Sequence, residues 1–298
     1  MTLDLDTFLT TVYVAVDDVY KEHLQPLLPA RRGPAPRLSD SEVLTLALLA
    51  SWGRWSSDRA FWRWAQTHLP AHFPRLGSLS RFHRRRQTLA PLLGLLFRTL
   101  AQQTAPPSPY RVLDATPVPV VKLPRWERSP FRGEAALSWC AAKREWYVGF
   151  KLFLAVTPEG VITSAALLPA NVGDRPGAES IFVQEQHPCY LADKGFCSQA
   201  WEQEWRERFG VTVLAAPYRR HKRAWPTKVY RRMSRRRQIV EVVINLLKDG
   251  FGLERHRAKT VAGLTAQVTA KLAAYVLGVA LNARLHRRLL AFASLIAW

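Results

Sequence analysis

The sequence has few cysteines, no secretory signal and no uninterrupted apolar run of the roughly 20 residues that a bilayer requires. Cys140, Cys189 and Cys197 form no C-x-x-C pair, which argues against a disulfide framework and a structural zinc site and indicates a reducing cytoplasm. The first residues contain no basic segment followed by a small-residue cleavage site. The longest apolar run, LAAYVLGVALNARL, is interrupted by Asn282 and Arg284, so it is interpreted as a buried core helix.

Acidic residues are scarce relative to basic ones. The 298 residues include 43 Lys and Arg but only 23 Asp and Glu, which gives a formal net charge of +20 and a pI near 10.6. Hydrophobic residues make up 48% of the chain, enough to form the core of one large domain with an appendage, or of two domains. A globular protein with such a basic excess is expected to bind a polyanion, nucleic acid before a membrane surface.

The first part of the chain has the pattern of packed helices. Ser39 and Glu42 have capping-box spacing at the start of the wide apolar stripe of LSDSEVLTLALLASW. DRAFWRWAQTHL predicts a second helix, and SLSRFHRRRQTLAPLLGLLFRTLAQ predicts a third with a basic first half. That basic half contains three adjacent arginines, Arg84, Arg85 and Arg86. These elements favour a helix-turn-helix-like DNA-binding region over 1–105. The alternative is a helical bundle with a solvated basic face.

Short apolar and β-branched runs follow the linker TAPPSP. YRVLDATPVPV, WYVGFKLFLAV and GVITSAALLPA lie close together, as expected for antiparallel strands, and CYLADKGF and VTVLAAPY come later. The helical pattern SQAWEQEWRERFG lies between the last two runs, as in a crossover between parallel strands. We therefore expect an α/β fold with a mixed sheet. The predicted domains are a helical region over 1–105 and a sheet domain with C-terminal helices over 106–298.

The last part of the chain is basic and then helical. Residues 215–260 carry more than half of the net positive charge, and an apolar helical pattern follows over about 261–290. The following basic residues of this part are expected to bind DNA phosphates: Arg219, Arg220, Lys222, Arg223, Arg235, Arg236 and Arg237. Trp225 lies among them and either stacks on an unpaired nucleotide or anchors its loop.

Three carboxylates occupy positions at which functional groups gather. Asp114 and Asp193 each follow an apolar run where a strand is expected to end, and Glu241 lies beside the apolar stripe of a predicted helix. Taken alone, each has a structural explanation. Asp193 either pairs with Lys194 or ends a strand in a turn, and Glu241 forms an intrahelical ion pair with Arg237.

The three carboxylates together also have a chemical explanation. If they converge, they repel one another unless divalent cations neutralise them. Hard oxygen ligands select Mg²⁺ or Mn²⁺. Two such ions stabilise both the attacking and the leaving oxygen of a phosphodiester. Acids at two strand ends and on one helix, in a strongly basic protein, therefore favour metal-assisted phosphoryl transfer on nucleic acid.

Five blocks of this sequence resemble, in order, those of bacterial insertion-sequence transposases of the DDE class, which have a ribonuclease H-like core. The blocks are VLDATPVPV, GFKLFLAVTPEG, ALLPANVGDRPGA, LADKGF and EVVINLLKDGFGLERHRAKTVAGL, over roughly residues 108–290. The resemblance implies that Asp114, Asp193 and Glu241 form the catalytic triad and bind two Mg²⁺ or Mn²⁺ ions per active site. It also implies double-stranded DNA as the partner (transposon ends and target), a homodimer assembled on DNA, and a cytoplasmic, nucleoid-associated protein without a membrane partner.

The resemblance extends to residues around the glutamate. Arg237 and Lys248 match basic positions of the family near Glu241, and Lys248 is a further expected DNA contact. Ser234 stands where many relatives have a tyrosine, and Tyr230 lies one turn earlier. This departure leaves the triad intact, and it leaves open whether a DNA hairpin forms during strand-end processing.

Lys151, Asn171 and Asp174 also match positions of the family. Lys151 and Lys194 are expected to contact the DNA backbone, and Lys194 alternatively pairs with the preceding aspartate. Asn171 and Asp174 either close a turn beside the site or take part in it.

The predicted function is that of a transposase, which cuts DNA at the ends of an insertion sequence and transfers the freed strand into target DNA. One alternative is a metal-dependent nuclease of the same fold that does not transfer strands. A second alternative is a DNA-binding regulator whose triad is inactive. The presence of all three acids favours the two enzymes over the regulator.

Overall fold

The computed structural model describes residues 2–29, 33–52, 55–217 and 225–296. It forms two compact units. One, here called the helical unit, consists of Met1–Thr104 and Leu246–Trp298, and the other, the sheet unit, consists of Ala105–Asn245. Among the expected DNA contacts, four lie outside the described residues, namely Arg219, Arg220, Lys222 and Arg223.

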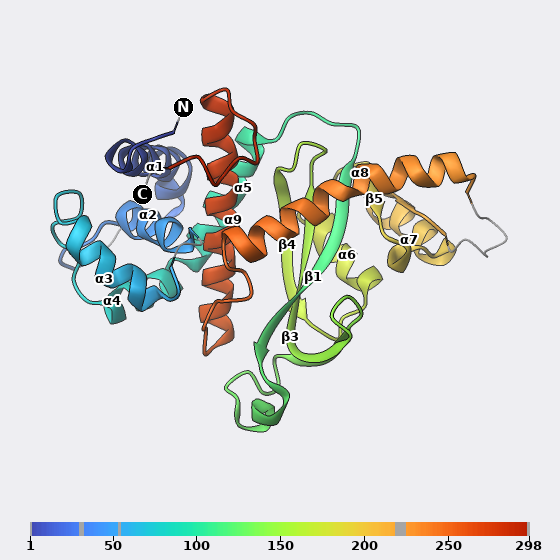
Figure 1. Cartoon of the computed structure of the whole chain (residues 1–298), viewed down its shortest axis with the longest axis horizontal. Coiled ribbons are helices and arrows are strands. Elements are labelled where there is room, and N and C mark those ends of the chain that lie inside the picture. The colour runs from blue at the N-terminus through green and yellow to red at the C-terminus, as the bar shows by residue number, and fades with distance from the viewer. Residues whose placement is uncertain (1, 30–32, 53–54, 218–224, 297–298) are drawn as a thin grey trace. The chain divides into compact units, whose positions relative to one another are not determined.

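The sheet unit contains a mixed six-stranded sheet (Figure 1). Its strands are β1 (Arg111–Val121), β2 (Ala136–Cys140), β3 (Glu145–Val156), β4 (Ile162–Pro169), β5 (Cys189–Ala192) and β6 (Thr212–Ala215). The strand order is β2-β3-β1-β5-β6, and β4 pairs with the same long strand β3. Strands β1 to β4 pair antiparallel, whereas β5 and β6 continue the sheet in parallel. The expected antiparallel set followed by a parallel crossover is therefore present.

Three α-helices accompany the sheet: α6 (Asp174–Phe182), α7 (Gln199–Phe209) and α8 (Thr227–Asn245). A short 3₁₀ helix, η3 (Leu123–Arg128), follows β1, and another, η4 (Lys194–Phe196), follows β5. Side chains of α6 and α7 pack with inward-facing residues of the strands in one buried core. Leu113 points into this core. Because successive side chains of a strand alternate between faces, Asp114 points to the opposite face, where α8 lies. A mixed sheet flanked by helices is compatible with the expected ribonuclease H-like fold.

Strand β1 contains Pro117 and Pro119 although it lies inside the sheet. The pairing with β5 covers only the start of β1, at Arg111 and Val112. Beyond Val112, β1 is paired on one side only, with β3. Prolines are tolerated where the backbone N–H has no ladder to join. Gly149 of β3 lies opposite Pro119, and a Cβ there would come within 2.2 Å of the Val118 carbonyl oxygen, so only glycine allows this close approach.

The helical unit is built around α9 (Val261–Arg284), which is buried along most of its length. The remaining helices are α1 (Leu5–Val19), η1 (Tyr20–Leu24), η2 (Gln25–Leu27), α2 (Asp40–Ser51), α3 (Asp58–His68), α4 (Leu79–Thr88), α5 (Ala90–Thr104) and η5 (Leu246–Gly250). Helix α9 packs against α5, α2 and α4. By length and composition it is apolar enough to cross a membrane, but most of it is buried inside the unit, as in a core helix.

Two local predictions in the helical unit have different outcomes. The capping box at α2 is confirmed: Ser39 Oγ accepts a hydrogen bond from the Glu42 N–H at 3.1 Å, and the Glu42 carboxylate accepts one from the Ser39 N–H. The predicted continuous third helix is wrong, because the chain forms α4 and α5 with a break at Leu89. Pro91 follows the break, and a proline fits the first turn of a new helix but not the interior of an existing one.

Residues Leu246–Trp298 form one compact unit with the N-terminal helices, whereas the sequence pattern groups them with the sheet. The apolar stripe of α9 shows that the helix packs against something but not against what. In the structure it packs against α5 and α2, which are distant in the sequence. The functional division into 1–105 and 106–298 stays a prediction.

Candidate active site

The two aspartates predicted to act together lie side by side in the sheet unit. Parallel pairing aligns Arg111 of β1 with Tyr190 of β5, and the next residues with each other. Continuing this register by two positions aligns Asp114, inside β1, with Asp193, which directly follows β5. Parallel strands therefore bring together two carboxylates that are far apart in the sequence.

Arg237 of α8 forms ion pairs with both aspartates. Its Nη1 donates to Asp193 Oδ1 at 2.9 Å, and its Nη2 lies 3.6 Å from Asp114 Oδ2. The guanidinium is mostly buried, and its Nε has no hydrogen-bond partner among the residues that the structure describes. One positive charge thus lies between two carboxylates and offsets part of their negative charge.

Burial is the main influence on Asp114. It raises the pKa of this carboxyl to about 6, while a hydrogen bond from the Ala115 N–H at 2.8 Å and the charge of Arg237 oppose the rise. The charges of Asp193 and Asp174 add to the rise. A carboxyl crowded by other carboxyls in a poorly solvated place gains most from a nearby cation.

Glu241 lies on α8, four residues after Arg237 and thus one turn further along the same side of the helix, a rise of about 6 Å. Its side chain is exposed, and among the described residues it forms no hydrogen bond or ion pair. The intrahelical pair with Arg237 that the sequence allows is absent, because Arg237 bonds to the aspartates instead. Helix α8 packs against β1 and β5, so it carries Glu241 along the strands that bear the aspartates.

In the described part of the chain, no three His, Cys, Asp or Glu side chains gather closely enough to form a metal cluster. The donor chemistry nevertheless fits a hard cation, because Asp114 and Asp193 present adjacent carboxylate oxygens. Arg237 supplies the positive charge between them in this structure.

A fourth carboxylate, Asp174, lies near the aspartate pair, as its effect on the pKa of Asp114 indicates. It is the first residue of α6, and Lys151 of β3 donates to its Oδ1 at 3.1 Å and to the Val172 carbonyl at 3.0 Å. A Cβ on Gly195 would come within 2.7 Å of Asp174 Oδ2. Asp174 therefore links Lys151 to the turn that follows the second aspartate.

The remaining predicted DNA contacts of the sheet unit lie near α8 or η4. Lys194 and Arg235 are exposed. Arg236 is exposed and lies over the ring of Tyr110, with 5.4 Å from its Cζ to the ring centroid. Trp225 is half-buried directly before α8. Asn171, predicted beside the site or in a turn, is exposed in the turn before α6.

The predicted basic residues of the helical unit have varied surroundings. Lys248 of η5 forms an ion pair with Glu254, with 3.3 Å between Nζ and Oε1. Arg84 is exposed.

The two arginines that follow Arg84 are engaged within the unit. Arg85 pairs with Asp40, and Arg86 is buried with its Nη2 2.7 Å from Asp58 Oδ2. The sequence pattern does not identify these acidic partners, because each lies on another helix.

Comparison with known proteins agrees with this geometry. A family model described as the transposase DDE domain matches residues 106–277, more than half of the chain. The searches of curated proteins and of solved structures gave no match. Proteins of this family process DNA and generally use divalent metal ions, which fits the carboxylate oxygens of the site. The adjacent aspartates of β1 and β5 and the matching family model together place the chain in the DDE transposase family of insertion sequences.

Proposed function

We propose that this protein is the transposase of an insertion sequence, which cuts DNA at the ends of the element and joins the freed 3′-hydroxyl to target DNA. The observation that carries the proposal is the alignment of Asp114 on β1 with Asp193 directly after the parallel strand β5, with Arg237 in an ion pair with each. The family match over 106–277 supports the same class of reaction.

Asp114 and Asp193 would hold the divalent ions, Mg²⁺ or Mn²⁺ and two per site, and Glu241 would complete the ligand set from α8. When bound, these ions activate water or a 3′-hydroxyl and stabilise the leaving oxygen of the phosphodiester. The exposed carboxylate of Glu241 is free of protein partners among the described residues, as a ligand for such an ion should be.

Arg237 has two parts in this proposal. In the protein without metal it offsets part of the negative charge of the paired aspartates through its two terminal nitrogens. Once metal ions balance the aspartates, its terminal N–H groups would be released to donate to an oxygen of the scissile phosphate. Arginine is better suited than lysine to this double contact because its guanidinium is a planar fork with five N–H donors.

The DNA backbone would lie along exposed lysine and arginine side chains near the site. Lys194, Arg235 and Arg236 are exposed, and phosphate contacts of this kind position DNA without reading its sequence. The two ends of an element need two active sites, which supports a homodimer assembled on double-stranded DNA.

Single-turnover cleavage and strand transfer test this function. The substrate is a labelled duplex taken from the DNA that flanks the coding region, incubated with the full chain and Mg²⁺ or Mn²⁺. Asp114→Asn, Asp193→Asn and Glu241→Gln should each abolish cleavage while DNA binding is retained. Glu207→Gln, which removes an exposed acid on α7, is the matched control and should cleave normally.

The products separate transposition from simple cleavage. Joined products in a strand-transfer assay support the transposase, whereas cleavage without joining assigns a nuclease. Full activity in any of the three triad variants would remove that residue from the active site. Metal-independent cleavage would overturn the proposal.

A further inference from the structure

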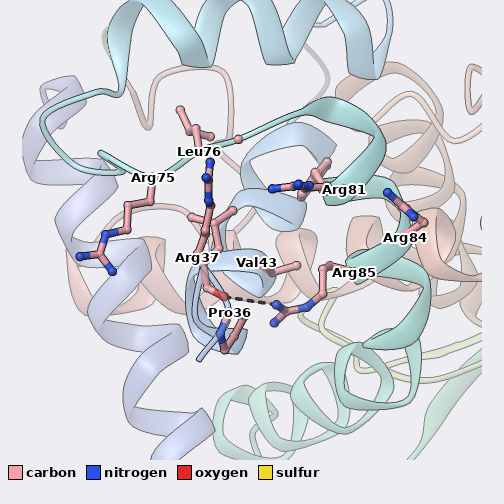
Figure 2. Close-up of a pocket in the computed structure, with 11 residues that line it drawn as sticks. Pro36, Arg37, Val43, Arg75, Leu76, Arg81, Arg84 and Arg85 are labelled. Carbon is pink, nitrogen blue, oxygen red and sulfur yellow. Dashed lines mark hydrogen bonds between the residues drawn. The ribbon is translucent and has the colours of Figure 1, made fainter. Parts of the chain in front are cut away.

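Two further surfaces are made of residues outside the candidate active site. One is a pocket of about 340 Å³ in the helical unit, between the segment before α2 and the first turns of α4, and five arginines line it (Figure 2). These arginines belong to the region already predicted to bind DNA. The other surface is the hairpin formed by β2 and residues Glu145–Gly149 of β3, here called the ribbon, whose side chains have no part in the proposed function.

The ribbon extends beyond the rest of the sheet. Strand β1 pairs with β3 only from Val148 onward, so Glu145, Trp146 and Tyr147 of β3 have β2 as their one paired neighbour. In the part of the chain that the structure describes, no strand pairs with the outer edge of β2. A two-stranded ribbon is only marginally stable, and an edge strand presents unpaired N–H and C=O groups to any further strand.

The edge strand β2 lacks the features that usually prevent such pairing. Its five residues, ALSWC, include no charged residue and no proline, although 22% of the chain is charged. Its pairing with β3 is continuous and contains no bulge. Natural edge strands usually carry lysine, proline or a bulge, which keep other chains from pairing with them. We therefore expect another strand to cover this edge.

Two tryptophans form an exposed apolar pair on the ribbon. Trp139 and Trp146 lie opposite each other on β2 and β3, with 5.6 Å between their ring centroids, and they are 48% and 55% exposed. Among the described residues, no other tryptophan, tyrosine or phenylalanine is exposed. Their mutual contact stabilises the ribbon, but it leaves about half of each residue in water.

The apolar pattern of the ribbon is complementary to a second copy of itself. If two β2 strands pair antiparallel about a two-fold axis at Ser138, the middle residue, then Trp139 of one copy lies opposite Leu137 of the other. Both side chains point to the same face of the ribbon, on which Val148 lies opposite Leu137 within each copy. The pairing therefore joins two apolar patches into one four-stranded face.

Charge complementarity favours the same arrangement. Antiparallel pairing places the residues before β2 of one copy beside the β2–β3 turn of the other, at both ends of the contact. Glu134 is exposed before the strand, and the turn carries the exposed side chains of Lys143 and Arg144. Arg132, which also precedes the strand, pairs with Glu127, with 3.2 Å between Nη2 and Oε2. An acidic side chain at the start of each strand therefore lies near the basic turn of the other copy.

We propose that two copies of this chain associate through the ribbon, with their β2 strands paired antiparallel across a two-fold axis. The proposal goes beyond the proposed function, in which the homodimer assembles on DNA, because ribbon pairing requires neither DNA nor metal. Each half-exposed tryptophan would bury roughly 100 Å², which places the contact among the small, weak interfaces. Association is therefore expected at micromolar concentrations, and the binding of two copies to one DNA molecule would strengthen it.

Sedimentation velocity of the full chain without DNA, at about 50 µM and at two salt concentrations, tests the ribbon. The variant Trp139→Thr/Trp146→Thr removes the exposed apolar pair and keeps residues that favour strands. It should weaken self-association by more than about thirtyfold. The matched control Val183→Thr/Val229→Thr removes two exposed apolar side chains elsewhere in the sheet unit and should change little. A circular dichroism melt checks that both variants fold.

The variant Glu134→Lys tests the same arrangement with the tryptophans in place. Glu134 is exposed and lies outside the strand, so the substitution leaves the ribbon folded and adds a lysine near the basic turn of the other copy. Self-association should weaken by about fivefold, and more at low salt than at high salt. The matched control Glu207→Lys makes the same charge change on α7 and should have a smaller effect.

Three outcomes would overturn the proposal. A wild-type chain that stays monomeric under these conditions would show that the ribbon forms no contact between copies. Wild-type association of the tryptophan variant would place the interface elsewhere, and a loss of duplex affinity in that variant would assign the ribbon to DNA. Equal effects of Glu134→Lys and its control would contradict the antiparallel arrangement. A chain that associates through the ribbon but never cleaves DNA would contradict the proposed function and support the ribbon.

Discussion

Arg237 forms ion pairs with one carboxylate on β1 and one directly after β5, although the sequence suggests only a local pair with Glu241 on the same helix. The family pattern and the helical spacing identify this arginine as part of the site. Neither identifies its partners, because the distance from α8 to β1 and β5 is a property of the folded sheet unit. The sequence therefore yields candidate side chains here, whereas their contacts come from the folded structure.

Arg237→Ala should lower the rate of single-turnover cleavage at saturating DNA by more than about tenfold, while affinity changes by less than about threefold. The reason is that the variant removes a donor at the reacting phosphate and leaves two adjacent carboxylates without a counter-charge. Arg237→Lys, which keeps the charge but not the fork, should recover only part of the rate. Wild-type cleavage by Arg237→Ala would leave this residue no role in catalysis.

Lys271 of α9 provides a residue-scale test of the helical unit. Burial lowers the pKa of its ammonium to about 8, although the charge of Asp58 opposes this shift and those of Arg86 and Arg255 add to it. Its Nζ donates to the carbonyl of Phe251. The sequence shows a lysine within an apolar stripe, but its burial depends on the helices that surround α9.

The sign of the pH effect follows from the lowered pKa. Between the folded pKa of about 8 and the unfolded pKa of 10.5, the unfolded chain binds the proton more strongly, so stability rises with pH. Lys271→Met should remove this rise. The stability of the variant relative to wild type should decrease by about 2 kcal/mol between roughly pH 7.5 and 9.5 in chemical denaturation. A difference that is independent of pH would show that Lys271 titrates normally.

At the scale of single elements, the sequence predicts what is encoded locally. The capping box of α2 depends on residues three apart, and the strands of the sheet are apolar runs bounded by turns. The break at Leu89 also has a local signal, the proline two residues later, which the strong helical pattern on both sides conceals. The contact between Asp174 and Gly195 has no such signal, since it joins a helix start to a turn after another strand.

Gly195→Ala should impair the active site more than the fold. The added methyl would come within 2.7 Å of Asp174 Oδ2, and Lys151 holds that carboxylate from the other side. The turn after Asp193 would then move, displacing this residue from its partner on β1. We expect cleavage to slow by about tenfold or more with a shift of only a few degrees in the melting temperature.

The control for this prediction is Gly94→Ala on α5, where an added Cβ meets no atom within 4 Å. It should cleave normally and be slightly more stable, because alanine favours a helix over glycine by about 1 kcal/mol. If Gly195→Ala also cleaves at the wild-type rate, the close approach of Asp174 does not determine the position of the site.

At the scale of the whole chain, composition shows a basic protein, and the residue pattern predicts a helical part and a sheet part, both of which are present. The packing partner of α9 cannot be predicted in this way, because its pattern of apolar residues is equally compatible with a sheet or with other helices as its neighbour. Contacts between elements more than 150 positions apart, such as α5 (Ala90–Thr104) and α9 (Val261–Arg284), bring the end of the chain into the helical unit. Local patterns carry no information on such pairings.

This pairing predicts the behaviour of fragments. Residues 1–104 alone lack α9, which fills the centre of the helical unit and packs against α2, α4 and α5. Without it, the apolar faces of these three helices would be exposed to water, at a cost of roughly 25 cal/mol for each Å². The fragment should therefore melt without a cooperative transition. Any DNA affinity measured on it would be that of an unfolded basic chain and not that of the folded helical unit.

Supplying the missing helix should restore the unit. Co-expression of 1–104 with 246–298 should give a complex that melts cooperatively and binds duplex DNA. The destabilised control is Lys271→Asp in the second segment, because it places an acid at a position buried among helices. Circular dichroism melts and anisotropy on the same samples measure both properties. A cooperative melt of 1–104 alone, with the helix content of the co-expressed complex, would show that the N-terminal helices form their own core and that α9 is dispensable to it.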